Sequence, residues 1–238
     1  MIGENDNADL ILGISTSSHV GSVAWVDIFE QKIIHSESWQ SRRPPLQNTA
    51  APQDAHEVTT GPLQDRPWSH TAALPSIFAK KRHLLSRTLR VAVGLGPGSH
   101  SGIRAAIVAA RALELSREIP VFGVCCHDAI AREITTVEEL CIVSDAGRDM
   151  AAISRYIGGR RAEGPRLATW QHVCEIATQT TTVASHPLGQ MPALRIVPPD
   201  AIHTAQAHIA TRHSGQPPLP LEPITLHESA YKKFPSAS

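Results

Sequence analysis

The stretch of sequence that decides the fold is VGLGPGSHSGIRAAIVAARALELSREIPVFGV, residues 93–124. It completes one apolar run, turns through glycines and a proline, continues into an alanine-rich segment and closes in a second apolar run. Glycine lets the backbone turn tightly, and the apolar residues that follow recur three and four positions apart, which is the spacing of an amphipathic helix. The stretch therefore predicts a strand, a tight turn, a helix over residues 101–117 and a second strand.

The glycine turn is a candidate site for contact with an anion or a nucleotide, because a helix that starts after it offers free backbone N–H groups. The residues that would make this contact are Gly96, Gly98, Ser99 and Gly102. Catalytic phosphate signatures are missing, since the turn has no P-loop lysine and its spacing is G-x-G-x-G rather than G-x-G-x-x-G. The alternative, a tight turn that only connects a strand to a helix, stays open.

The segments before this stretch predict the first part of an α/β chain. Apolar runs over 10–14, 20–28 and 31–38 predict three strands in hairpin order. Ser69 can cap a helix over 70–82. Between these elements, residues 41–67 hold five prolines and little apolar periodicity, which predicts a flexible insertion.

The second half again places strands before a helix. Runs over 140–144 and 151–157 predict neighbouring strands, and Asp200 can cap a helix that ends near residue 212. This order of elements predicts two α/β lobes. We expect the first lobe to span residues 1–135 and the second to span residues 136–238.

The alanine-rich helix carries two apolar stripes, and a helix with two apolar faces needs two coverings. The second stripe is Val108, Ala112 and Leu115. One covering is the chain's own sheet and the other is a partner, unless both faces are covered within the chain. We predict that this helix and the helix over 70–82 form a partner surface, because small side chains let a second helix approach closely. Its residues are His70, Leu74, Ile77, Phe78, Ile103, Ala106, Ile107, Ala109, Ala110 and Leu113.

Composition argues against several classes of function. The 22 Lys and Arg residues balance 22 Asp and Glu residues, whereas a protein that grips RNA alone usually has a basic excess. The four cysteines form no C-x-x-C pair, so reduced thiols and no metal site are expected. The first ten residues are polar and no apolar run reaches membrane length, which predicts a soluble cytoplasmic protein with no membrane contact. We expect no cofactor.

The central stretch resembles the TsaB (YeaZ) family. That family carries the block G-x-G-P-G-S-[FY]-T-G-[LI]-R, an alanine-rich helix and then I-P-x-x-G-V, which this chain matches over 94–104 and 119–124. Three weaker matches lie in the right order around it, at 11–17, 70–75 and 223–227.

The resemblance implies an actin/Hsp70-like fold (ASKHA, ribonuclease H-like) with two lobes and mixed sheets. It also implies a non-catalytic scaffold subunit of the complex that makes N6-threonylcarbamoyladenosine next to the tRNA anticodon. Its partners would be a TsaD-like catalytic subunit and a TsaE-like ATPase, and tRNA would be reached only through the complex. A homodimer through the same helices would exclude the heterodimer.

The chain departs from the family at positions that bear on catalysis. Ser15 stands where the family has an aspartate, so a carboxylate that could hold a metal near a nucleotide is gone. Asp145 remains from the second-lobe motif D-A-R-x-x-E-x-Y, whose other polar positions are lost. TsaD-like relatives bind metal through H-x-x-x-H, and here His70 is followed at that spacing by Leu74. An ATP-dependent phosphotransferase of the same fold remains the alternative function, and a metallopeptidase lacks its ligands.

Overall fold

The computed structural model describes residues 9–41, 69–213 and 219–226, and these form two lobes. The predicted insertion over 41–67 lies, apart from Ser41, outside the described residues. Within them the strands make two five-stranded sheets, ordered β3-β2-β1-β4-β5 and β10-β9-β6-β7-β8. Each sheet mixes parallel and antiparallel pairs, so the α/β fold with mixed sheets is confirmed.

The first sheet follows the predicted hairpin order. Its strands are β1 (Leu10–Ser15), β2 (Val20–Asp27), β3 (Ile33–Gln40), β4 (Thr88–Gly94) and β5 (Val121–Val124). The central strand β1 pairs antiparallel with β2 and parallel with β4. All six residues of β1 are buried, which explains why its sequence is a continuous apolar run rather than an alternating one.

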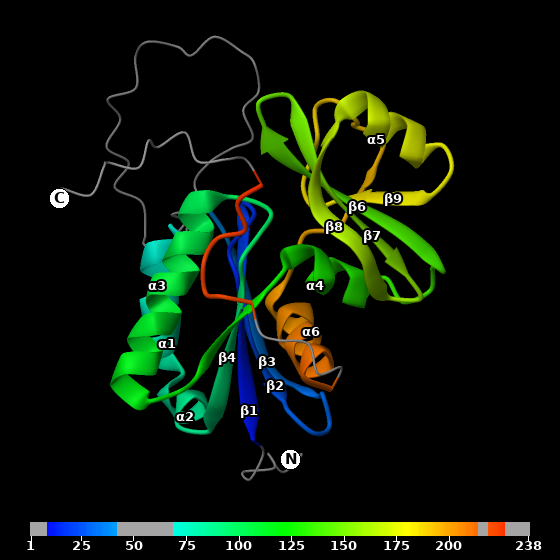
Figure 1. Cartoon of the computed structure of the whole chain (residues 1–238). Coiled ribbons are helices and arrows are strands. Elements are labelled where there is room, and N and C mark those ends of the chain that lie inside the picture. The colour runs from blue at the N-terminus through cyan, green and yellow to red at the C-terminus, as the bar shows by residue number, and fades with distance from the viewer. Residues whose placement is uncertain (1–8, 42–68, 214–218, 227–238) are drawn as a thin grey trace, which may run out of the picture.

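Helices cover both faces of the first sheet (Figure 1). On one face lie α1 (His70–Lys80), α2 (Arg82–Leu85) and α3 (His100–Arg117), which close a core around Leu12, Trp25 and Leu74. Ser69 caps α1 and Ser99 caps α3, because the side-chain oxygen of each serine accepts a hydrogen bond from a backbone N–H group in the first turn of its helix.

The second sheet is built from later elements. Its strands are β6 (Glu139–Gly147), β7 (Met150–Ile157), β8 (Arg160–Thr169), β9 (Thr181–Ala184) and β10 (Arg195–Ile196). Helix α4 (Cys126–Glu133) packs on one face and α5 (Trp170–Ala177) on the other. The sequence predicted no strand where β8 forms.

The predicted boundary of the second lobe is wrong at its C-terminal side. Helix α6 (Ala201–His213) lies on the face of the first sheet opposite α3, where Ala201, Ala205 and Ile209 join a buried cluster with β1, β2 and β4. Ile224 N also donates to Leu95 O at 2.9 Å. Described residues after Pro199 therefore belong to the first lobe, because the chain returns to it after the second sheet.

A search for helices that could span a membrane, made over the residues with described structure, found none that is long and apolar enough.

Candidate functional site

The glycine turn packs tightly against the β1–β2 turn. A Cβ atom on Gly98 would meet the carbonyl oxygen of Ser17, and one on Gly102 would meet the carbonyl oxygen of Thr16. Gly96 and Gly98 also have positive φ values of 97° and 153°, which side chains disfavour. Gly98 and Gly102 are therefore required by the close approach of two backbone segments, and Gly96 is favoured by its positive φ.

Hydrogen bonds fix the same contact. Ser99 N donates to Ser17 O at 2.7 Å, and Thr16 Oγ1 donates to Gly102 O at 2.8 Å. Beneath the turn, the buried thiol of Cys126 donates to Ser17 Oγ at 3.1 Å. The chain's own backbone thus lies against the start of α3, which favours the tight connecting turn. Anion contact at Gly96, Gly98, Ser99 and Gly102 stays a prediction.

The side chain of His70 links α1 to β3 and to the β1–β2 turn within the first lobe. Its Nδ1 accepts from Trp39 Nε1 at 3.2 Å, so its Nε2 carries the proton and donates to Ser18 O at 3.2 Å. Burial lowers the pKa of His70, which keeps the ring neutral. Leu74, where TsaD-like relatives carry a second histidine, is fully buried in the core and offers no ligand atom.

Most of the predicted partner residues face the chain's own sheet, so their assignment to a partner surface is wrong. They are buried between the helices and the sheet, where a partner cannot reach them without opening the fold. This holds for His70, Leu74, Ile77, Phe78, Ile103, Ala106, Ala110 and Leu113. Ile107 and Ala109 are partly buried against the same core.

The second stripe of α3 is the exposed one. Val108 is 69% exposed and Leu115 is 85% exposed, and Ala112 lies between them on the same face. Arg104 and Arg111, also exposed, share this face because they lie four residues before Val108 and four before Leu115. The sequence pattern identified both stripes but could not show which one the sheet would cover.

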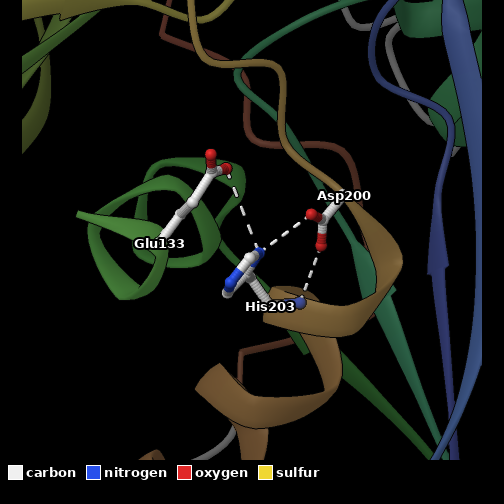
Figure 2. Close-up of side chains that lie close together, drawn as sticks. All are labelled: Glu133, Asp200 and His203. Carbon is white, nitrogen blue, oxygen red and sulfur yellow. Dashed lines mark hydrogen bonds and ion pairs between the residues drawn. The ribbon is translucent and has the colours of Figure 1, made fainter. Parts of the chain in front are cut away.

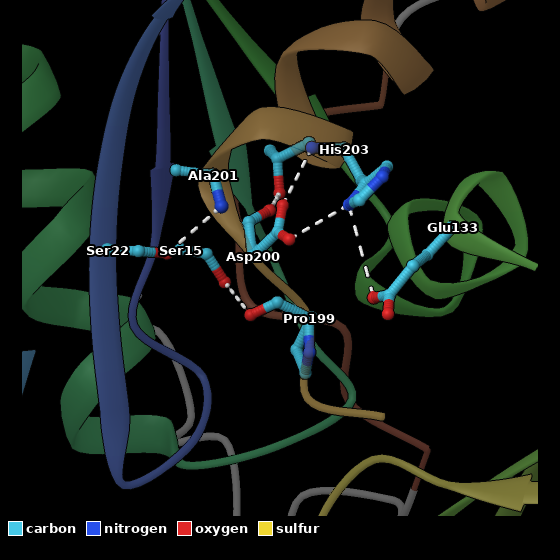
Figure 3. Close-up of polar contacts among 8 residues, drawn as sticks. Ser15, Ser22, Glu133, Pro199, Asp200, Ala201 and His203 are labelled. Carbon is cyan, nitrogen blue, oxygen red and sulfur yellow. Dashed lines mark hydrogen bonds and ion pairs between the residues drawn. The ribbon is translucent and has the colours of Figure 1, made fainter. Parts of the chain in front are cut away.

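A second candidate region lies where α6 begins, between the lobes (Figure 3). Ser15, at the end of β1, donates to Pro199 O at 2.9 Å, and Ala201 N donates to Ser22 Oγ at 3.0 Å. Ser15 is fully buried. The position where the family has an aspartate is therefore occupied by a hydroxyl that binds the connection between the lobes.

Glu133, Asp200 and His203 meet beside this connection (Figure 2). Asp200 Oδ1 accepts from His203 N at 2.7 Å, which is the predicted cap of α6, and Oδ2 accepts from His203 Nδ1 at 2.8 Å. Glu133 Oε2, at the end of α4, lies 4.0 Å from the same nitrogen. The hydrogen bond that His203 donates to Asp200 raises the pKa of His203.

Ligand atoms of these three residues lie within 4.8 Å of one another, close enough to share a cation. Both oxygens of Asp200, however, already accept hydrogen bonds from His203, so the group closes on itself as a helix cap and an ion pair. Its spacing across two helices, 133 and 200–203, gave no signal in the sequence. The expected absence of a metal stays a prediction.

Asp145, the residue that remains from the second-lobe motif, stabilises a turn. Its Oδ1 accepts from Gly147 N at 2.7 Å, and the next two residues, Arg148 and Asp149, have positive φ values of 53° and 56°. The carboxylate is exposed at the end of β6.

The comparison with protein families gives one match. Residues 72–185, the segment from α1 through β9, match the model of the TsaD family, tRNA N6-adenosine threonylcarbamoyltransferase. This segment includes the glycine turn, α3 and most of the second sheet.

Curated relatives match over a shorter segment. An uncharacterized protein of Mycobacterium tuberculosis is 41% identical over 77 residues, which is 32% of this chain and 36% of that protein. An uncharacterized protein of Mycobacterium leprae is 38% identical over 79 residues, or 33% of this chain and 21% of that protein. The match thus spans about a third, or less, of the length of these relatives.

Two solved structures share the fold over nearly the whole chain. One is an uncharacterized protein with similarity to peptidase YEAZ from Pseudomonas aeruginosa, with a TM-score of 0.64 and 18% identity. The other is YeaZ from Pseudomonas aeruginosa, with a TM-score of 0.61 and 17% identity. Each alignment covers 92% of this chain and all of the other. The chain therefore has the two-lobed fold of the YeaZ (TsaB) proteins, and its residues 72–185 match the TsaD family model.

Proposed function

We propose that this chain is the non-catalytic scaffold subunit of a complex that makes N6-threonylcarbamoyladenosine next to the tRNA anticodon, where it binds and supports a TsaD-like catalytic subunit. The YeaZ fold and the TsaD-family match support this assignment. The observation that carries it is the exposed apolar stripe of α3, because the opposite face of the same helix is buried in the chain's own core.

The proposed partner surface is the outer face of α1 and α3, which pack against each other. We define this outer face by the exposed residues Ala72, Pro75, Ala79, Val108, Ala112 and Leu115. Small residues let a second helix approach closely, and burying each large apolar side chain contributes about 1.5–3 kcal/mol. Two helices of a partner would complete a four-helix contact here.

Charge on this outer face bears on the choice of partner. Arg104 and Arg111 flank Val108 and Leu115, and Arg111 forms an ion pair with Glu114 on its own helix. A partner helix with acidic residues beside an apolar stripe would complement this edge, whereas a second copy of the chain would add further arginines. The heterodimer is therefore the proposed assembly, and a homodimer would compete for the same face.

The described site residues fit a role without catalysis. Ser15 provides no carboxylate for a metal near a nucleotide, and its hydroxyl is bonded to Pro199 O. Residues Thr16 and Ser17 pack against the glycine turn. An ATP-dependent phosphotransferase, the alternative function, would need an acidic residue at this place.

The remaining members of the assembly follow from the same proposal. A TsaE-like ATPase would join the complex in the cytoplasm, and tRNA would be bound through the complex. The chain's formal net charge of zero supports weak or no binding of tRNA by the chain alone.

The test is to purify the full chain with the TsaD-like protein of the same host. We expect a stoichiometric complex on size-exclusion chromatography and no ATP hydrolysis by the chain alone. Robust hydrolysis by the isolated chain would favour the phosphotransferase, and failure to form any complex would contradict the scaffold proposal.

A further inference from the structure

A series of four hydrogen bonds runs from the interior of the second lobe to His186, which is influenced by His19 of the first lobe. His127 Nδ1 lies 2.8 Å from Ser154 Oγ, and His127 Nε2 lies 2.7 Å from Ser144 Oγ. Ser144 Oγ lies 2.7 Å from Ser185 Oγ, which lies 2.8 Å from His186 Nδ1. This series links α4 with β6, β7 and the residues after β9.

Its inner members are sealed from solvent. His127 and Ser144 are fully buried, and Ser154 and Ser185 are nearly so. Burial, helped by the charge of Arg161 on β8 and by His186, lowers the pKa of His127 to about 3, so its ring is neutral near neutral pH. A neutral imidazole has one N–H donor and one acceptor nitrogen.

This limits where the protons can lie. Among the described residues, Ser144 Oγ and Ser185 Oγ have no hydrogen-bond partners besides their two neighbours in this series, so the single proton of each hydroxyl points to one neighbour and its oxygen accepts from the other. With all four hydrogen bonds formed, the series therefore has two arrangements of its protons. In the inward one, every donor points from His186 toward Ser154, and His127 carries its proton on Nδ1. In the outward one, every donor points the other way, and His127 carries its proton on Nε2.

His186 is the only residue of this series that is partly exposed to solvent. The ionisable side chains that act on it are Asp145 at the end of β6 and His19 in the β1–β2 turn of the first lobe. Burial is the largest effect and lowers the pKa of His186. Asp145 raises this pKa, and His19 lowers it further. Once protonated, both nitrogens of His186 carry hydrogen, so Nδ1 can only donate to Ser185.

We infer that this series of hydrogen bonds is a relay in which proton uptake by His186 fixes the buried His127 in its Nδ1–H tautomer. The relay couples the protonation state of His186 to the tautomer of His127 on α4, a helix that packs against both α6 and the second sheet. Any anionic group that approaches His186 between His19 and Asp145 would act in the same direction as acid, because it favours the imidazolium.

The test is side-chain nitrogen NMR of the full-length protein labelled at histidine, titrated from about pH 8 to about pH 4, because burial lowers the pKa of His186. We expect the Nδ1–H form of His127 to grow to the whole population with the same midpoint as the protonation of His186. A His127 tautomer that does not change through the titration of His186 would overturn the relay.

Three variants separate the relay from local effects. His186→Gln should leave the His127 tautomer independent of pH, and Ser185→Ala should let His186 titrate without any response at His127. His172→Gln, on α5, changes a side chain that is 45% exposed and outside the series, and it should keep the coupling intact. If either of the first two variants retains the response of His127, or if the control abolishes it, the inference is wrong.

Discussion

Ser15 Oγ donates a 2.9 Å hydrogen bond to the carbonyl oxygen of Pro199, a residue 184 positions later in the chain. The bond joins the end of β1 to the residue just before Asp200, where α6 is capped, and both partners are buried. It fixes the path by which the chain leaves the second lobe and returns to the first. The hydroxyl at this position therefore stabilises the join between the lobes.

Replacing Ser15 with aspartate should destabilise the protein. A carboxylate at this place would be buried against the Pro199 carbonyl oxygen, which offers it no proton, so we expect a loss of about 2–5 kcal/mol in the free energy of unfolding. Ser15→Ala, which removes the hydrogen bond and leaves one buried acceptor, should lose about 1–2 kcal/mol. Urea unfolding measures both, and equal stability of Ser15→Asp and the natural protein would contradict this account.

The glycine turn predicts a pair of costly substitutions with a matched control. Gly98→Ala and Gly102→Ala would each place a methyl group against the β1–β2 backbone, so we expect losses of about 1–3 kcal/mol or more. Gly189→Ala meets nothing within 4 Å and should change stability by less than about 0.5 kcal/mol. Thermal unfolding of the three variants tests this, and a result in which Gly98→Ala is as neutral as the control would exclude tight packing as the reason for the glycines.

Stability should fall on the acid side because of His127. In the folded protein the pKa of this buried ring is lowered to about 3, whereas in the unfolded chain it titrates near its usual 6.5. Between these values the unfolded state binds the extra proton, so the free energy of unfolding should drop as pH falls from about 6.5, by up to about 1.4 kcal/mol per pH unit.

His127→Gln isolates this contribution, since glutamine does not titrate. Burial also lowers the pKa of His70, His186 and His208, so part of the slope should remain in the variant. Chemical unfolding from about pH 7 to about pH 4 should show a shallower dependence in His127→Gln than in the natural protein. The same slope in both would contradict the buried neutral state of His127.

The cap of α6 makes a distinct prediction for Asp200. Asp200→Ala removes the acceptor of the His203 backbone N–H and should lose about 0.5–2 kcal/mol, while Asp200→Asn keeps a capping oxygen and should lose less. In the natural protein the raised pKa of His203 stabilises the fold below the usual histidine pKa of about 6.5, and this gain should disappear as pH rises through the raised value. Identical pH profiles for the natural protein and Asp200→Asn would show that the His203 pair contributes nothing.

Local signals were readable in the sequence, and relations between distant segments were not. Ser69 caps α1 with its side chain, so a capping residue before an apolar period was enough to place the start of this helix, and the apolar period after the glycine turn placed the start of α3 to within one residue. Strand β8 was missed because it is a mostly exposed edge strand that contains Gly164 and Pro165, and so lacks an apolar alternation.

The candidate site shows the same limit. The two stripes of α3 were visible, but the choice of the buried one depends on where the sheet lies, and so the residues assigned to the partner surface were those that face the core. The return of α6 to the first sheet depends on contacts such as Ala201 N with Ser22 Oγ, between residues 179 positions apart. Likewise, the serines around His127 come from separate strands and form no motif.

The central claim is that the outer face of α1 and α3 binds a TsaD-like partner, and the affinity of Leu115→Glu for that partner tests it most directly. Leu115 is 85% exposed, so the variant should fold normally, while a carboxylate buried in the contact should weaken binding by about 100-fold or more. Phe29→Glu is the matched control, because Phe29 is 78% exposed in the β2–β3 turn, away from α3. With both variants folded by circular dichroism, we predict that calorimetry shows the loss for Leu115→Glu and natural affinity for Phe29→Glu. Natural affinity of Leu115→Glu would contradict the claim.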